Sequence, residues 1–325
     1  MMQGRSQGIR FGISISEPET PLGIRGNPTV FVNQFSFQFA TQFLIEGGSL
    51  IFGQKWKKDG IMFHLADKYR EIIRFANASD SAVGNSENSP ILNFLAWPDE
   101  PPTDKVAEGM IRDGILKVRQ IETPGLYDTT LPIQHPEYEF WRVRALTAMR
   151  KQLVDHTNVR ICIGGASGQA TRRLPGIIEE AWMTINARKP LYLIGAIGGA
   201  ARAMVNLILQ RTMSESERDM FVSNRQCTVT MERYAEKYPY QEDEGPSYES
   251  EGWSAMRVFQ SPPLLEQLAF AAGLEVEEYI WMMTAPCAER AMQWVGKGVT
   301  NIATGLRGGI SSERSLHRST AVKPV

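Results

Sequence analysis

Residues 159–204 decide the fold of this chain, and they read VRICIGGASGQATRRLPGIIEEAWMTINARKPLYLIGAIGGAARAM. Two apolar runs, Val159–Ile163 and Leu191–Ile194, each end in glycine, and each is followed by apolar residues at helical spacing. This repeated order of strand, glycine turn and helix predicts two units of a parallel sheet covered by helices. Ligands of open parallel sheets bind outside the carboxyl ends of the strands, where helix N-termini attract anions. We therefore expect an anionic ligand, most simply a phosphorylated nucleotide.

The composition describes an ordinary globular protein. The 325 residues are 42% hydrophobic and 22% charged, which suits one large domain or two modest ones. A formal net charge of -1 gives no field that favours nucleic acid or an anionic membrane, so neither is expected as a partner. We find no signal peptide and no apolar run long enough to span a bilayer. The expected location is the cytoplasm.

The cysteines and histidines show no pattern of a metal site. Cys162, Cys227 and Cys287 are far apart and form no CxxC pair, so we expect reduced thiols, with Cys162 in the core. The histidines lack metal-ligand spacing, and no metal is predicted. The chain also has no Gly-x-Ser-x-Gly elbow and no Gly-Lys-Ser/Thr phosphate loop, which argues against NTP hydrolysis.

Strand and helix patterns alternate through most of the chain, and the predicted fold is α/β, a Rossmann-like parallel sheet sandwiched by helices with a helical C-terminal portion. Outside the central stretch, strands are predicted at 10–16, 49–52, 71–76, 91–97 and 117–121. Helices are predicted at 30–46, 59–70, 104–114, 137–154, 262–272, 275–283 and 286–295. We expect a nucleotide-binding domain over 10–212 and a surface excursion or insertion over 213–258. C-terminal helices over 259–304 are expected to complete the same domain or to mediate association, and a disordered tail is expected over 305–325.

Five patches of sequence, in order along the chain, resemble one family. They are Ser14–Pro18, Glu46–Gly53, Leu146–Arg150, Ile163–Gly165 and Ile197–Arg202, with the Glu179–Glu180 pair between the last two. Together they resemble the SLOG superfamily, which groups lonely-guy phosphoribohydrolases, the DNA-processing protein DprA, the ligand-sensing region of TRPM channels and sensors of bacterial antiviral defence. The closest likeness is to the TRPM-like prokaryotic branch, LSDAT. The chain departs from that branch at Gln54-Lys55, where the family usually continues Gly-His.

The resemblance implies a Rossmann-like sheet that binds a nucleotide or nucleotide sugar. In the defence branch the ligand is made from NAD, for example an ADP-ribose or cyclic ADP-ribose derivative produced by a TIR enzyme. The leading hypothesis is therefore a cytoplasmic sensor of such a nucleotide that requires no cofactor. Because no separate effector domain is recognisable, its output would come from a homo-oligomer or from an effector or TIR-type protein partner.

Two other functions stay open. The first is an N-glycoside hydrolase of a nucleotide, in which Glu179 is the catalytic carboxylate and Arg173 holds the phosphate. The hydrolase branch carries Pro-Gly-Gly-x-Gly-Thr-x-x-Glu, however, and this chain has Gly-Gly-Ala-Ser-Gly and then Leu-Pro-Gly-Ile-Ile-Glu-Glu. The second is a scaffold that keeps the fold without the pocket, in which bulky side chains at Gly165 or Gly199 would leave activity unchanged.

The candidate ligand residues cluster at the strand ends. Backbone N–H groups of the glycine doublets would approach phosphate, although tight turns need glycine even without a ligand. An arginine beside a helix N-terminus suggests an anion that binds both the arginine and the helix dipole. One carboxylate of the Glu-Glu pair, that of Glu179, would accept hydrogen bonds from ribose hydroxyls. From the residues alone Arg150 would be a surface arginine, and the resemblance makes it a ligand residue. The full set is Ser14, Ser16, Glu17, Gly53, Gln54, Arg150, Gly164, Gly165, Ala166, Arg172, Arg173, Gly176, Glu179, Glu180, Gly195, Gly198, Gly199 and Ala200.

A group of methionines and tryptophans near the C-terminus has helical spacing. It comprises Trp281, Met282, Met283, Met292 and Trp294. These residues are expected in the core, and a surface for self-association is the alternative.

Overall fold

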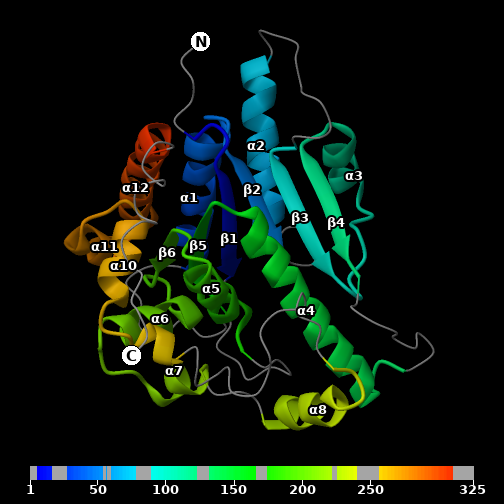
Figure 1. Ribbon diagram of the computed structural model, residues 1–325. Coiled ribbons are helices and arrows are strands. Elements are labelled where there is room, and N and C mark those ends of the chain that lie inside the picture. The colour runs from blue at the N-terminus through cyan, green and yellow to red at the C-terminus, as the bar shows by residue number, and fades with distance from the viewer. Residues whose placement is uncertain are drawn as a thin grey trace.

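A computed structural model describes residues 6–16, 28–53, 56, 60–77, 89–122, 132–165, 174–221, 225–239 and 256–309 (Figure 1). In this part of the chain six parallel strands form one sheet in the order β4-β3-β2-β1-β5-β6. The strands are β1 (Arg10–Ser16), β2 (Ser49–Gly53), β3 (Ile91–Ala96), β4 (Leu116–Ile121), β5 (Val159–Gly164) and β6 (Leu191–Ile194). Every residue of β5 and β6 is buried, as expected for parallel strands covered on both faces.

Helices surround the sheet, which confirms the predicted Rossmann-like α/β fold with a helical C-terminal portion. The helices are α1 (Pro28–Phe39), the π-helical η1 (Ala40–Leu44), α2 (Ile61–Asn77), α3 (Lys105–Arg112), α4 (Pro136–His156), α5 (Gly176–Asn186), α6 (Gly199–Ile208), α7 (Glu215–Asp219), α8 (Arg225–Ala235), α10 (Leu264–Ala271), α11 (Val276–Met283) and α12 (Ala288–Gly309). Helices α4 and α5 cross one face of the sheet, and α1, η1 and α2 cover the other (Figure 1).

The strand predicted at 71–76 is wrong, because these residues complete α2. The apolar positions of α2 recur every three or four residues, from Leu65 through Tyr69 to Ile72 and Ile73, and no glycine or proline interrupts them. A short apolar run fits a strand or a buried helix equally well by pattern alone. Here the helix already in progress extends through it.

The tail predicted to begin at 305 is also misplaced, because α12 continues to Gly309. Each glycine in this last turn costs about 1 kcal/mol of helix propensity. Extending an existing helix fixes one residue for one hydrogen bond, which avoids the cost of a new nucleus. Residues 310–325 lie outside the described part.

Residues 213–239 carry α7 and α8 and contribute several buried side chains. Met231 and Tyr234 of α8 pack on Phe140 and Trp141 near the start of α4. Both helices lie near the edge of the sheet where the strands end (Figure 1).

The C-terminal helices cover the β6 edge of the sheet. The hydroxyl of Tyr279 donates to the carbonyl of Leu191 at 2.7 Å, and that of Tyr192 donates to the carbonyl of Ala272 at 2.8 Å. Burial raises the pKa of both tyrosines. An uncovered edge strand offers unpaired backbone groups to other chains, so this cover removes one site of unwanted pairing. No helix in the described residues is both long enough and apolar enough to cross a membrane.

Candidate functional site

The strand order reverses between β1 and β5, and this reversal marks the candidate site. In open α/β sheets the ligand crevice lies outside the carboxyl ends of the strands at such a switch point. The segments that follow the two strands, 17–27 and 166–173, lie outside the described residues. The predicted ligand residues Glu17, Gln54, Ala166, Arg172 and Arg173, and the side chain of Ser16, are therefore not placed by the structure.

The two glycine turns pack directly against each other. Gly164, Gly165, Gly198 and Gly199 have φ values of 67°, 103°, 90° and 64°, a region that L side chains rarely adopt. A Cβ on Gly199 would overlap the carbonyl oxygen of Gly165, and one on Gly165 would lie 2.9 Å from the Cβ of Ala200. A bulky side chain at Gly165 or Gly199 would therefore disrupt the turns whether or not a ligand binds there.

The N-termini of α5 and α6 converge on Gly165. A Cβ on Gly165 would lie 2.9 Å from Ile177 of α5 and 2.9 Å from Ala200 of α6. The N-cap residues are Pro175 and Gly198, and neither has a side chain that can cap its helix; among the described residues no cap hydrogen bond is seen at either helix. The first N–H groups of each helix lack intrahelical partners, and the helix dipoles add partial positive charge. This geometry suits an anion.

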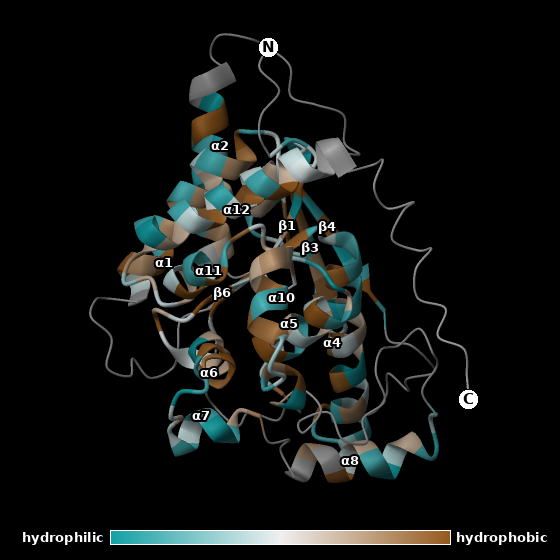
Figure 2. Cartoon of the chain, turned by 60° about the vertical axis from the view of Figure 1, so that its left-hand side comes forward, coloured by the Kyte–Doolittle hydropathy of each residue, from teal (hydrophilic) through white to brown (hydrophobic). Residues whose placement is uncertain are grey.

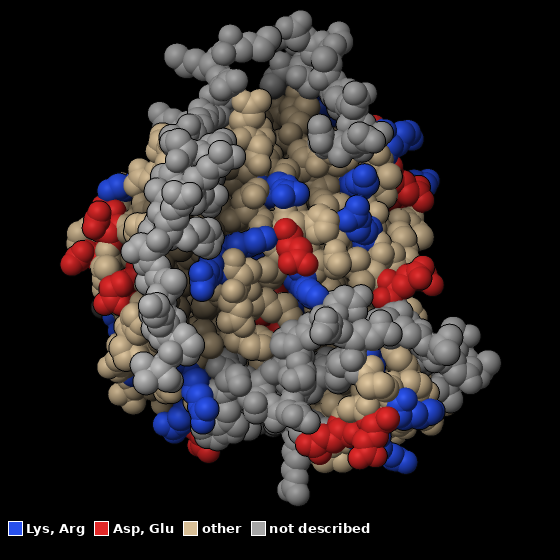
Figure 3. Space-filling model, viewed as in Figure 1, with Lys and Arg blue, Asp and Glu red and all other residues tan. Residues whose placement is uncertain are grey.

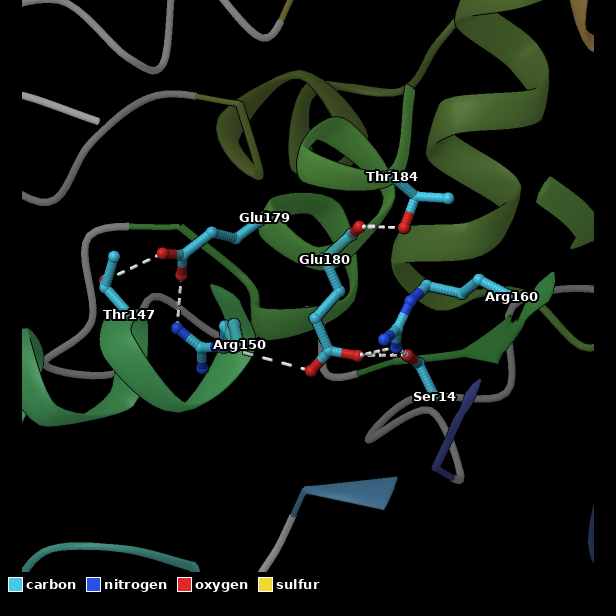
Figure 4. Close-up of polar contacts among 7 residues, drawn as sticks. All are labelled: Ser14, Thr147, Arg150, Arg160, Glu179, Glu180 and Thr184. Carbon is cyan, nitrogen blue, oxygen red and sulfur yellow. Dashed lines mark hydrogen bonds and ion pairs between the residues drawn. The ribbon is translucent and has the colours of Figure 1, made fainter. Parts of the chain in front are cut away.

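A layer of buried charge lies on the face of β1 and β5 that α4 and α5 cover (Figure 4). Arg160 of β5 donates from Nη1 to Oγ of Ser14 at 2.9 Å and to Oε2 of Glu180 at 2.6 Å. The Ser14 hydroxyl also donates to Glu180. Arg160 is fully buried, so this ion pair is shielded from water.

A second ion pair joins α4 to α5. Arg150 donates from Nη1 to Oε2 of Glu179, and the hydroxyl of Thr147 donates to Oε1 of the same carboxylate at 2.7 Å. Arg150 Nε lies 3.9 Å from Oε1 of Glu180, which connects the two pairs. We call Ser14, Thr147, Arg150, Arg160, Glu179 and Glu180 the ion-pair layer.

The interpretation of Arg150 as a surface arginine is wrong, because Arg150 is only 6% exposed. The sequence also suggested that one of Glu179 and Glu180 at most would face the site, since neighbouring helix residues point about 100° apart. Both are buried. Arg150 of α4 pairs with Glu179, and Arg160 of β5 pairs with Glu180.

Sequence reasoning missed Arg160, which it included in an apolar run. A charged residue inside an otherwise apolar strand was the available signal, because arginine is almost never fully buried without a partner. The neighbouring strand makes room for it at Gly12, where a Cβ would lie 2.9 Å from Nη2 of Arg160.

Packing accounts for three other glycines among the predicted ligand residues. A Cβ on Gly53 would lie 2.9 Å from Met149 of α4, and one on Gly176 would lie 2.7 Å from Nη2 of Arg150. Gly195 donates its N–H to the carbonyl of Met283 at 3.0 Å. Their roles as ligand residues stay predictions.

The face that carries α4 and α5 has Lys and Arg side chains in its middle, and acidic side chains lie mainly toward its margins (Figure 3). Within the described ranges no three His, Cys, Asp or Glu side chains form a group able to hold a metal ion. Cys162 is buried in β5 as predicted, and burial raises the pKa of its thiol to about 12.

A protein-family model described as SLOG cluster2 matches residues 5–250, about three quarters of the chain. The matched part contains all six strands and the ion-pair layer, and α10, α11 and α12 lie beyond it. None of the curated proteins compared with the chain matches it. The match confirms the predicted superfamily, and the narrower LSDAT branch stays a prediction. Membership of this superfamily implies nucleotide-related binding.

Proposed function

This chain belongs to the SLOG superfamily, and we propose that it is a sensor that binds an NAD-derived nucleotide of the ADP-ribose type at the β1–β5 switch point. One observation carries the proposal: two helix N-termini, whose N-cap residues Pro175 and Gly198 provide no side-chain cap, meet at a pair of touching glycine turns beside the end of β5. A diphosphate placed there would accept hydrogen bonds from backbone N–H groups of both helices.

In this proposal the phosphates lie on Gly164, Gly165, Gly198 and Gly199, with Arg173 as a further contact. A ribose hydroxyl would donate to Glu179. Each carboxylate oxygen can accept about two hydrogen bonds, and Thr147 and Arg150 each use one position on Glu179. The ion pair would thus hold the carboxylate still while leaving acceptor capacity for the sugar.

The wider role follows from the likeness of the chain to defence sensors. We place it in the cytoplasm, in antiviral defence, with no cofactor, and with an output through self-assembly or through an effector or TIR-type partner. A diffusible nucleotide would be the signal.

Hydrolysis of the nucleotide is less compatible with this geometry. A catalytic acid or base must be free to exchange a proton with the substrate. A general acid must carry the proton on its own carboxyl, but Thr147 and Arg150 both donate to Glu179, and Arg160 donates to Glu180, so both carboxylates are held as acceptors. These contacts favour a holding role over a chemical one.

The test is a thermal-shift panel with AMP, NAD, ADP-ribose and cyclic ADP-ribose isomers, followed by chromatography of each mixture. A ligand at one hundred times its dissociation constant adds about 2.7 kcal/mol of stability, which raises the melting temperature. We expect an ADP-ribose-type ligand to raise it and to be recovered intact.

Arg173→Ala should lose most of this shift. Arg112→Ala is the matched control, because Arg112 ends α3 beside the distant strand β4 and its side chain is 80% exposed. Release of a free base would favour the hydrolase instead. No shift with any nucleotide would favour the scaffold.

A further inference from the structure

Helices α11 and α12 have two different faces. Their inner side chains complete the core beside β6, where Met282, Met283 and Met292 are buried. Their outer face exposes Trp281, which is 55% accessible, and its ring lies 5.5 Å from the half-buried ring of Trp294. The expectation that this cluster lies in the core is confirmed for Met282, Met283 and Met292. It is wrong for Trp281, and self-association stays a prediction.

Charges of opposite sign flank the two tryptophans. On α11, Glu277 and Glu278 lie four and three residues before Trp281, which places them on its side of the helix. On α12, Arg290 and Lys297 lie four residues before and three after Trp294. We call these six residues the tryptophan face; Figure 2 brings its helices forward.

The two helices run in opposite directions at this face. Trp281 contacts Trp294, and Glu278 pairs with Lys297, so residue numbers rise along α11 as they fall along α12. Glu277 therefore lies about 6 Å to one side of the tryptophan pair, and Arg290 lies about 6 Å to the other side on the neighbouring helix. Neither of these two makes an ion pair with another described residue.

We propose that the tryptophan face is a two-fold interface with a second copy of this chain. A two-fold axis that brings two copies face to face lies in the plane of this face. The axis that passes through the tryptophan pair and runs diagonally to the helices, perpendicular to the line from Glu277 to Arg290, exchanges these two residues. It places Glu277 of one protomer opposite Arg290 of its partner, twice, around four tryptophans.

Such an interface is self-complementary, as two-fold symmetry requires. Tryptophan and arginine are also the residues that most often dominate the binding energy of interfaces. The opposite charges on the two sides of the tryptophan pair let the same face serve both protomers. The inference is independent of the proposed nucleotide site, which lies at the strand ends.

The test is sedimentation equilibrium of the full chain without nucleotide. We expect a dimer. Trp281→Ala should weaken dimerisation by roughly thirtyfold, the size of an interface hot spot. Val229→Ala is the control, because Val229 is exposed to a similar degree on α8, and it should leave the dimer intact. Unchanged thermal unfolding of each variant's monomer shows that the fold survives.

The charge swap is the sharper experiment. Glu277→Arg alone and Arg290→Glu alone should each shift the equilibrium toward monomer, and the double variant should restore the dimer. A wild-type monomer at all concentrations, a dimer that Trp281→Ala does not weaken, or a double variant that stays monomeric would overturn the proposal.

Discussion

The two faces of β1 and β5 are built from the same strands and hold opposite chemistry. On one face Phe11 of β1 contacts the rings of Phe39 and Phe43, with centroids 5.3 and 4.7 Å away. On the other face Ser14 and Arg160 meet Glu180. Both faces are buried, so exposure to water does not explain the difference.

The contrast separates what the fold needs from what a site needs. An apolar face is stabilised by every contact, whereas buried charges are favourable only when each has a partner. Replacing a buried ion pair by well-packed apolar residues is often neutral or stabilising. In the proposed function, this layer under the switch point serves to hold Glu179 in place for a ligand rather than to add stability.

The largest expected effect comes from breaking the ion-pair layer. Arg160→Met should lower the free energy of unfolding by about 3–5 kcal/mol in urea denaturation, because it leaves Glu180 buried without its main partner. Adding Glu180→Met should recover at least half of that loss. Losses that simply add would show that the two side chains do not act as a pair.

A smaller effect is expected from one hydrogen bond in the same layer. Thr147→Val should cost about 2 kcal/mol, because it removes a donor to the buried Glu179 carboxylate and keeps the volume of the side chain. Thr147→Ser keeps the hydroxyl and should cost clearly less. Equal losses in the two variants would assign the effect to packing.

The apolar face should respond more gently to a comparable change of shape. Phe39→Leu should cost about 1–1.5 kcal/mol, through a small cavity and the loss of the ring contacts with Phe11, Phe35 and Phe43. A loss larger than that of Arg160→Met would reverse the comparison.

The smallest effect concerns pH and Cys162. Burial raises the pKa of this thiol from 9.0 to about 12, so the unfolded chain loses its proton first. Its contribution to stability is complete below pH 9 and is lost as pH rises toward 12. The free energy of unfolding should fall by about 1 kcal/mol between pH 9 and pH 10, and less in Cys162→Ala. Parallel curves for the two proteins would contradict this.

Much of the fold could be predicted from the sequence, because glycine turns and apolar periodicity fix where strands and helices alternate. The exceptions have local causes. Residues 71–76 satisfied two patterns, and only the preceding helical turns decided between them. The end of α12 could not be placed, because the helix extends through glycine residues whose presence in the sequence predicts a helix end.

The candidate site was predicted less completely, because its partners come from distant segments. The sequence indicated the glycine turns and the Glu179–Glu180 pair. It did not indicate that Arg150 is buried or that Arg160 pairs with Glu180, since both facts depend on how α4 and α5 pack over β1 and β5. The roles of Arg172 and Arg173 stay predictions.

Hydrogen exchange with and without ADP-ribose would locate the ligand on the chain. We expect slower exchange at the first amides of α5 and α6, residues 176–179 and 199–202, with no change in α3. Protection confined to other elements, or no protection at these two helix N-termini at a saturating ligand concentration, would contradict a nucleotide site at the β1–β5 switch point.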